Sequence, residues 1–201
     1  MRTALTPLQR HELVQRYNEP FRVYHNLEHI TILFQLAAAH GLRLSIPQQL
    51  AIWYHDAIYF PNGGVENEQR SAELLRSHME SNCWISKALV DRAYKMILAT
   101  KRHLSDDNET QVVLDLDLAG LGFDSESYYS AACKVRVEYN HLPDEVWNTN
   151  RAIFLKGMLD REYIFYTSWG RDFYEKQARR NMQAELNQLQ VEAMLKHTSW
   201  T

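Results

Sequence analysis

Residues 171–196 read RDFYEKQARRNMQAELNQLQVEAMLK, and small or apolar side chains recur through this stretch at helical spacing. Ala178, Met182, Leu186, Leu189 and Ala193 follow one another in steps of 4, 4, 3 and 4 residues. Such steps place side chains on one face of an α-helix. The stretch therefore predicts a long helix whose apolar seam packs against the protein core or against a partner.

Helical signals recur along the rest of the chain. Thr6-Pro7, Ser45-Ile46-Pro47 and Asp124-Ser125 are typical helix starts, and Gly41 is a typical helix end. The 201 residues include only seven Gly and five Pro, roughly half the average usage of both, so we expect long helices with few breaks. The predicted helices cover about residues 7–17, 26–40, 46–59, 66–79, 86–100, 111–121, 125–140, 144–160 and 171–196.

No stretch shows the alternation of apolar and polar residues that favours a β-strand, and no internal repeat or linker is apparent. The fold class that follows is all-α, with one helical domain over residues 1–201. With 45% hydrophobic residues the chain can build a core, which excludes intrinsic disorder. A net charge of −3 argues against nucleic-acid binding driven by net charge.

The cysteines and the chain start predict a soluble, cytoplasmic protein. Cys83 and Cys133 stand in apolar-leaning contexts without a CxxC motif, and we expect them to be reduced, small buried hydrophobes. No apolar run reaches the roughly 18–20 residues that a membrane span needs. The first seven residues, Met1 to Pro7, lack the apolar region of a signal peptide.

Two histidine motifs suggest metal chemistry. In His25-Asn26-Leu27-Glu28-His29 the histidines stand at i and i+4, so on a helix they would share one face and could bind one ion. Tyr54-His55-Asp56 holds a His-Asp doublet. Neighbouring side chains on a helix point about 100° apart, so both members reach one ion only from a helix end or a bent turn.

A third motif places two carboxylates in an otherwise apolar run. Leu114-Asp115-Leu116-Asp117-Leu118-Ala119-Gly120-Leu121-Gly122 contains no other charged residue. Burying an unpaired carboxylate costs several kcal/mol, so at least one of these acids should have a cation or a strong donor beside it.

Taken in order, the three motifs resemble the HD superfamily of metal-dependent phosphohydrolases, whose signature is an isolated His, a His-Asp doublet and a distant Asp. The strings at residues 24–30, 53–57 and 115–119 are similar to an uncharacterised bacterial branch of that superfamily, and the similarity extends over nearly the whole chain. The resemblance implies a single helical bundle of the HD type. It also implies that the metal ligands are His29, His55, Asp56 and Asp117.

Two assignments in this ligand set leave alternatives open. The last acid of the family commonly stands in Ala-Asp-x-Leu, of which Asp117 keeps only the acid and its apolar surroundings, so Asp115 remains an alternative. His29 is followed by Ile30 and Leu33, as the first His of the family should be. His25 then supports the metal site from outside or faces the substrate.

The resemblance implies a phosphohydrolase that uses a metal-activated water. Mixed nitrogen and oxygen ligands suit Mn²⁺, Fe²⁺, Co²⁺, Ni²⁺, Zn²⁺ or Mg²⁺, as one ion or two. The expected substrate is small and phosphorylated: a phosphomonoester, a phosphodiester or a nucleotide. Besides Asp56, the candidate catalytic residues are Glu68, which could orient the water, and Lys101 and His103, which could contact phosphate oxygens.

Other functions compete for the same residues. His25-x-x-Glu28-His29 matches the HxxEH motif of zinc peptidases, with Glu28 as general base, although that motif leaves His55, Asp56 and Asp117 unexplained. A non-catalytic helical module that binds a metal or a partner is another alternative. The apolar seam of residues 171–196 could join two copies into a homodimer.

Overall fold

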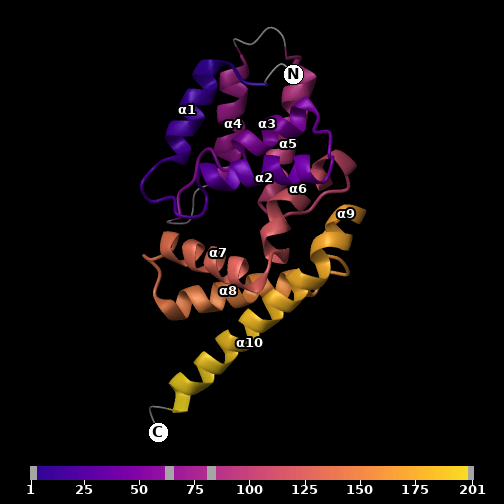
Figure 1. Cartoon of the computed structure of the whole chain (residues 1–201). Coiled ribbons are helices and arrows are strands. Elements are labelled where there is room, and N and C mark those ends of the chain that lie inside the picture. Colours follow the sequence, from indigo (N-terminus) through magenta and orange to yellow (C-terminus); the bar gives the residue numbers. More distant parts are fainter. Residues whose placement is uncertain (1–3, 62–65, 81–84, 199–201) are drawn as a thin grey trace. The chain divides into compact units, whose positions relative to one another are not determined.

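The computed structural model describes residues 4–61, 66–80 and 85–198, and in those ranges every regular element is a helix. This confirms the predicted all-α class. The elements follow in the order α1 (Pro7–Tyr17), α2 (Leu27–Ala39), α3 (Ile46–Tyr54), α4 (Asn67–Met79), α5 (Lys87–Thr100), α6 (Asn108–Leu118), the 3₁₀-helix η1 (Ala119–Gly122), α7 (Ser125–Glu138), α8 (Asp144–Leu159), α9 (Ser168–Gly170), the π-helix η2 (Arg171–Glu175) and α10 (Lys176–Thr198) (Figure 1).

The chain divides into two compact units, residues 1–117 and residues 118–201. That the chain forms a single domain of the HD type stays a prediction.

The predicted helix boundaries at Thr6, Asn26 and Gly41 are present in the structure. Thr6 and Gln9 form a capping box at the start of α1, with Pro7 as the first helical residue. Asn26 caps α2 through its side-chain oxygen, which accepts from the backbone of Glu28 and His29. Gly41 follows α2 with a φ of +65°, the left-handed conformation that a glycine adopts at little cost.

Helix α3 is the centre of the first unit. It packs against α2, α4 and α5, and Leu50, Ala51, Ile52 and Tyr54 are fully buried. The sequence pattern predicted that this helix continues to about residue 59, which is wrong, because α3 ends at Tyr54 and residues 55–58 form a turn.

In the second unit, α10 packs against α8 and η1. Of the predicted seam, Ala178, Met182 and Leu186 are buried in the core of this unit, whereas Leu189 is half-buried and Ala193 is exposed. The backbones of η1 and η2 approach so closely that a Cβ on Gly122 would lie 2.5 Å from the Cβ of Tyr174. Only glycine therefore fits at this crossing.

Cys133 is exposed, which contradicts the expectation that it is a buried hydrophobe, while Cys83 lies outside the described residues. The helix α7 presents Cys133 on its solvent side.

Among the helices of the described ranges, none combines the length and the apolar character that crossing a bilayer requires.

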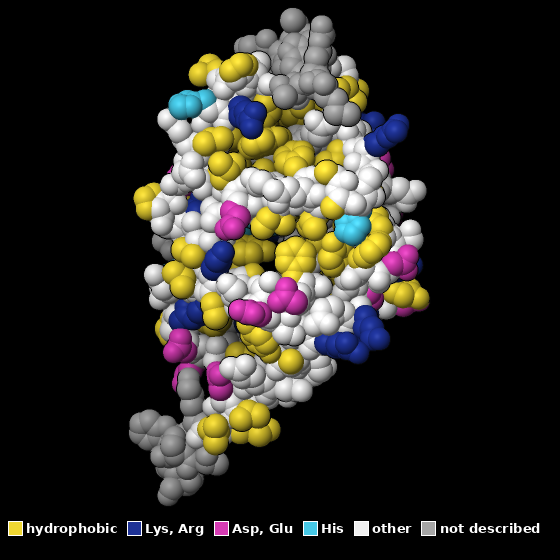
Figure 2. All heavy atoms as spheres, viewed as in Figure 1, with side chains coloured by type: hydrophobic (Ala, Val, Ile, Leu, Met, Phe, Trp, Pro, Cys, Tyr) yellow, Lys and Arg dark blue, Asp and Glu magenta, His cyan; other side chains and the backbone are white. Residues whose placement is uncertain are grey.

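On the face drawn in Figure 2, Lys and Arg side chains are interspersed with Asp and Glu side chains. Such mixing fits the small net charge of −3.

Candidate metal centre

Three side chains from distant parts of the sequence converge within the first unit. His29 lies in the first turn of α2, His55 directly follows α3, and Asp117 lies near the end of α6. One ligand atom from each of them lies within 4.8 Å of those from the other two. The Nε2 atom of His29 is 3.1 Å from Oδ1 of Asp117 and 3.4 Å from Nε2 of His55. The structure thus brings together the isolated His, the doublet His and the distant Asp.

The turn after α3 lets both members of the doublet face this cluster. His55 is the C-cap of α3, and the chain leaves the helical path at Asp56. The Oδ2 atom of Asp56 lies 3.0 Å from Nε2 of His55 and 4.0 Å from Nε2 of His29. A helix that continued through residue 59 would have turned the two side chains apart, so the early helix end brings Asp56 beside the cluster.

The distances between these donors suit a transition-metal ion. For metal–ligand bonds of about 2.1 Å, neighbouring ligands lie about 3.0 Å apart in an octahedron and about 3.4 Å apart in a tetrahedron. The distances of the His29, His55 and Asp117 donors from one another are 3.1 to 3.4 Å. Two imidazoles and two carboxylates also form the mixed set that such ions accept. The residues present therefore fit the metal that the sequence predicted.

A backbone contact orients the imidazole of His55. Its Nδ1 atom lies 3.0 Å from the carbonyl oxygen of Ile52, to which Nδ1–H donates. That hydrogen bond directs the Nε2 atom toward the cluster, as in most metal-binding histidines. His55 is 2% exposed, so packing holds the ring in place as well.

The carboxylates of the cluster stay ionised. Burial raises the pKa of Asp117. The nearby charge of His55, together with hydrogen bonds from His103, His29 and His55, outweighs burial, so this pKa lies well below its usual value. The pKa of Asp56 is lowered in the same way: burial raises it, and His55 and His25 outweigh that effect. For His55, burial lowers the pKa, whereas Asp56 and Asp117 raise it to well above its usual value. Without a cation, the two carboxylates thus hold a proton on His55, and a dication that binds there would take the place of that proton.

His103 reaches the cluster from the segment that follows α5. Its Nε2 atom lies 3.0 Å from Oδ2 of Asp117, on the oxygen that does not face His29. Its backbone φ is +49°, and among the described residues no other non-glycine residue has a positive φ. This conformation is strained for a side chain with a Cβ.

The remaining sequence candidates lie in other environments. Lys101 is exposed at the C-cap of α5, and Glu68 is half-buried in the first turn of α4. Neither belongs to the donor cluster. Asp115 is fully buried and also lies outside the cluster. Of the two acids in the apolar run, Asp117 is the one that faces the histidines.

His25 does not share a helix face with His29, contrary to the sequence expectation, because α2 begins after its cap Asn26. The His25 ring stacks on Tyr59 with centroids 4.3 Å apart and meets the edge of Tyr24 at 4.9 Å. Its ring centroid is 6.2 Å from that of His29. The helical HxxEH geometry of a zinc peptidase is therefore not formed.

Sequence reasoning missed the residues that hold the doublet turn. The guanidinium of Arg22 donates to the carbonyl oxygens of Asp56 and Ala57. The Ser71 hydroxyl, on α4, bonds both backbone groups of Ile58. The Tyr17 hydroxyl donates to the carbonyl of Trp53. Each contact spans at least 13 residues of sequence, and no local pattern signals them.

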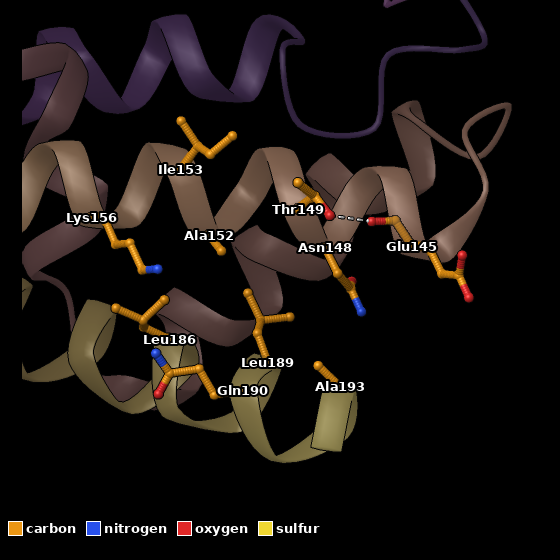
Figure 3. Close-up of a pocket in the computed structure, with 10 residues that line it drawn as sticks. All are labelled: Glu145, Asn148, Thr149, Ala152, Ile153, Lys156, Leu186, Leu189, Gln190 and Ala193. Carbon is orange, nitrogen blue, oxygen red and sulfur yellow. Dashed lines mark hydrogen bonds between the residues drawn. The ribbon is translucent and has the colours of Figure 1, made fainter. Parts of the chain in front are cut away.

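A separate groove lies in the second unit, between α8 and α10 (Figure 3). Its volume is about 620 Å³, and Ala152, Ile153, Leu186 and Leu189 supply much of its apolar lining. Glu145 and Lys156 are the ionisable residues among its lining. Among the described residues, the group of three side chains that could hold a metal ion lies in the first unit and not in this groove.

Comparisons of the chain with protein-family models, with curated proteins and with solved structures find no match.

Proposed function

We propose that this protein is a metal-dependent hydrolase of a phosphate ester, of the HD type that the sequence motifs resemble. The observation that carries the proposal is the convergence of the buried His29 and His55 on the half-buried Asp117, with Asp56 beside them. Four donors of these types would hold one divalent ion. When bound, such an ion lowers the pKa of a water molecule and polarises a phosphoryl oxygen.

The protein side chains would supply the rest of the catalysis. Asp56 faces the histidines with Oδ2, so its second carboxylate oxygen would be the one left to accept a proton from the attacking water. His103 orients Asp117 through Oδ2. Lys101, at the exposed end of α5, would contact phosphate oxygens once a substrate is bound, and Glu68 would help to orient the water.

The donor cluster supports hydrolysis of a phosphate ester without selecting one kind of ester. A phosphomonoester, a phosphodiester and a nucleotide all offer the same phosphoryl oxygens to a bound cation. The first test is therefore a panel of all three substrate kinds, assayed with Mn²⁺, Co²⁺, Ni²⁺, Zn²⁺ or Mg²⁺ added to the metal-free protein.

The ligand assignment predicts that His55→Ala, Asp56→Ala and Asp117→Asn abolish both metal content and hydrolysis while helicity stays near normal. The matched control is His11→Ala, because His11 is an exposed histidine of α1 outside the cluster. Metal content is measured by elemental analysis, helicity by circular dichroism. A variant in the first group that keeps full metal and full activity contradicts the assignment.

Two other outcomes would redirect the proposal. A wild-type protein that binds a cation and hydrolyses no ester of the panel would be the non-catalytic metal-binding module. Peptidase activity that is lost in Glu28→Gln and kept in Asp117→Asn would indicate a zinc peptidase instead.

A further inference from the structure

Arg22 is a buried cation that the proposed hydrolysis does not use. Its side chain is 0% exposed, although it lies in the loop between α1 and α2. Burying a guanidinium is costly unless its donors are satisfied. The contacts of Arg22 must therefore offset the cost of burying its charge.

Those contacts join two segments of the metal centre. The Nη1 atom donates to the carbonyl oxygens of His25 (3.0 Å) and Asp56 (2.8 Å), and Nη2 donates to that of Ala57 (3.2 Å). The first segment leads into α2, which carries His29, and the second is the doublet turn. One rigid group thus connects the start of one ligand-bearing helix to the turn after another.

The remaining surface of the guanidinium is also occupied. Its Nε atom donates to Oε2 of Glu19 at 2.9 Å. Its Cζ atom lies 5.3 Å from the ring centre of Tyr17 and 5.4 Å from that of Tyr59, within the range of cation–π contacts. With its donors directed at backbone carbonyls and at Glu19, Arg22 is a poor ligand for a substrate phosphate and well placed to fix the backbone.

From this geometry we infer that Arg22 is a positioning residue for the metal centre. It holds the backbone of residues 55–57 close to the start of α2, so that the donor atoms of His55 and Asp56 lie near that of His29. The inference rests on the metal site of the proposed function. Neighbours that orient ligands in this way typically contribute about 10- to 100-fold to metal affinity.

A second arginine provides a matched control. Arg179, in the second unit, donates to the carbonyls of Leu159, Arg161 and Glu162 and pairs with Glu175 at 2.7 Å. It makes the same kinds of contact as Arg22, but no ligand of the metal centre lies in the segments that it joins. Replacing Arg179 should therefore lower stability without changing metal affinity.

The experiment measures Mn²⁺ dissociation constants by calorimetry for the full-length wild type, Arg22→Lys, Arg22→Met and Arg179→Lys, each with a melting curve. We expect both Arg22 variants to bind Mn²⁺ about 10-fold more weakly or worse, and Arg179→Lys to bind within about twofold of wild type. Arg22→Lys keeps the charge and loses the planar fork. Arg22→Met also removes the positive charge, which by electrostatics alone would tighten cation binding.

Unchanged or tighter binding in Arg22→Lys and Arg22→Met overturns the inference, and so does equal weakening in Arg179→Lys. Should Arg22→Met fail to fold, Arg22→Lys decides alone, because it keeps the positive charge: weaker binding supports the inference and wild-type binding opposes it. If the wild type binds no Mn²⁺, the proposed function itself is contradicted. If the wild type binds Mn²⁺ and the Arg22 variants bind it with the same dissociation constant, only the role of Arg22 is contradicted.

Discussion

His103 combines an unfavourable backbone conformation with a contact to Asp117, an acid of the candidate metal centre. Its φ of +49° belongs to the left-handed region, which costs an ordinary residue roughly 1–2 kcal/mol. The imidazole that this conformation presents lies 3.0 Å from Oδ2 of Asp117. Strain retained beside a cluster of functional side chains is a common feature of active sites.

Two substitutions separate the strain from the imidazole. His103→Gly and His103→Ala both remove the ring, but only glycine adopts a positive φ at little cost. We therefore expect the free energy of unfolding of His103→Gly to exceed that of His103→Ala by about 1 kcal/mol. Urea denaturation of the metal-free variants measures it. An alanine variant that is as stable as the glycine variant would show that position 103 is not strained.

At the scale of single residues, the sequence could predict which side chains lie close together, but it could not predict the role of each one. The family resemblance implied His29, His55, Asp56 and Asp117. The structure places ligand atoms of His29, His55 and Asp117 within 4.8 Å of one another and Oδ2 of Asp56 3.0 Å from Nε2 of His55. Asp117 rather than Asp115 faces the histidines because side chains two positions apart on a helix point in different directions. His25 leaves the helix because Asn26 caps it, a competition that the i, i+4 spacing alone does not reveal.

At the scale of elements, the end of α3 could not be predicted locally. The apolar pattern of residues 50–57 suits a longer helix. In the structure, Arg22 and Ser71 instead bond backbone groups of residues 56–58. These partners come from other helices and loops, so tertiary contacts override the local pattern. The helix starts at Thr6, Asn26 and Ser45 are predictable because a cap is built from adjacent residues.

Asp107 stabilises the start of α6, the helix that carries Asp117. Its Oδ2 atom accepts from the backbone N–H of Thr110 at 2.8 Å and from the Thr110 hydroxyl at 2.7 Å. These two hydrogen bonds lower the pKa of Asp107. A carboxylate at a helix N-terminus also interacts favourably with the helix dipole.

The lowered pKa predicts a pH dependence of stability. The folded state holds the proton of Asp107 less tightly than the unfolded state. The charged Asp107 therefore contributes to the free energy of unfolding above the pKa of the unfolded state, and this contribution is lost as the pH falls through the lower pKa of the folded state. We expect wild type to be about 0.5 kcal/mol more stable than Asp107→Asn at pH 7. This difference should shrink below about pH 4. Denaturation at several pH values measures it.

The matched control for that series is Asp106→Asn, since Asp106 is an exposed neighbour of Asp107 in the same loop. Its difference from wild type should stay small over the same pH range. A difference for Asp107→Asn that does not change between pH 7 and pH 3 would contradict the capping role of the charge.

At the scale of the whole molecule, the donors of the candidate metal centre all belong to residues 1–117. The seam of α10 packs into the core of residues 118–201 through Ala178, Met182 and Leu186 and then emerges at the α8–α10 groove. A sequence pattern cannot distinguish these two uses, because core and partner packing require the same apolar spacing. A homodimer through this helix therefore stays a prediction.

Metal binding links these scales in one measurement. A ligand that binds only the folded state stabilises it by RT ln(1 + [L]/Kd), about 2.7 kcal/mol at a concentration 100-fold above Kd. For a chain of this size that corresponds to a rise in Tm of roughly 5–10 °C. If residues 1–201 unfold as the single domain that the sequence predicts, one calorimetric transition should shift as a whole when Mn²⁺ is added and return with EDTA. Asp117→Asn should show no shift, because it lacks the ligand carboxylate of α6. Two transitions, of which only one responds to Mn²⁺, would show instead that the two units unfold separately and that the cation stabilises only the first.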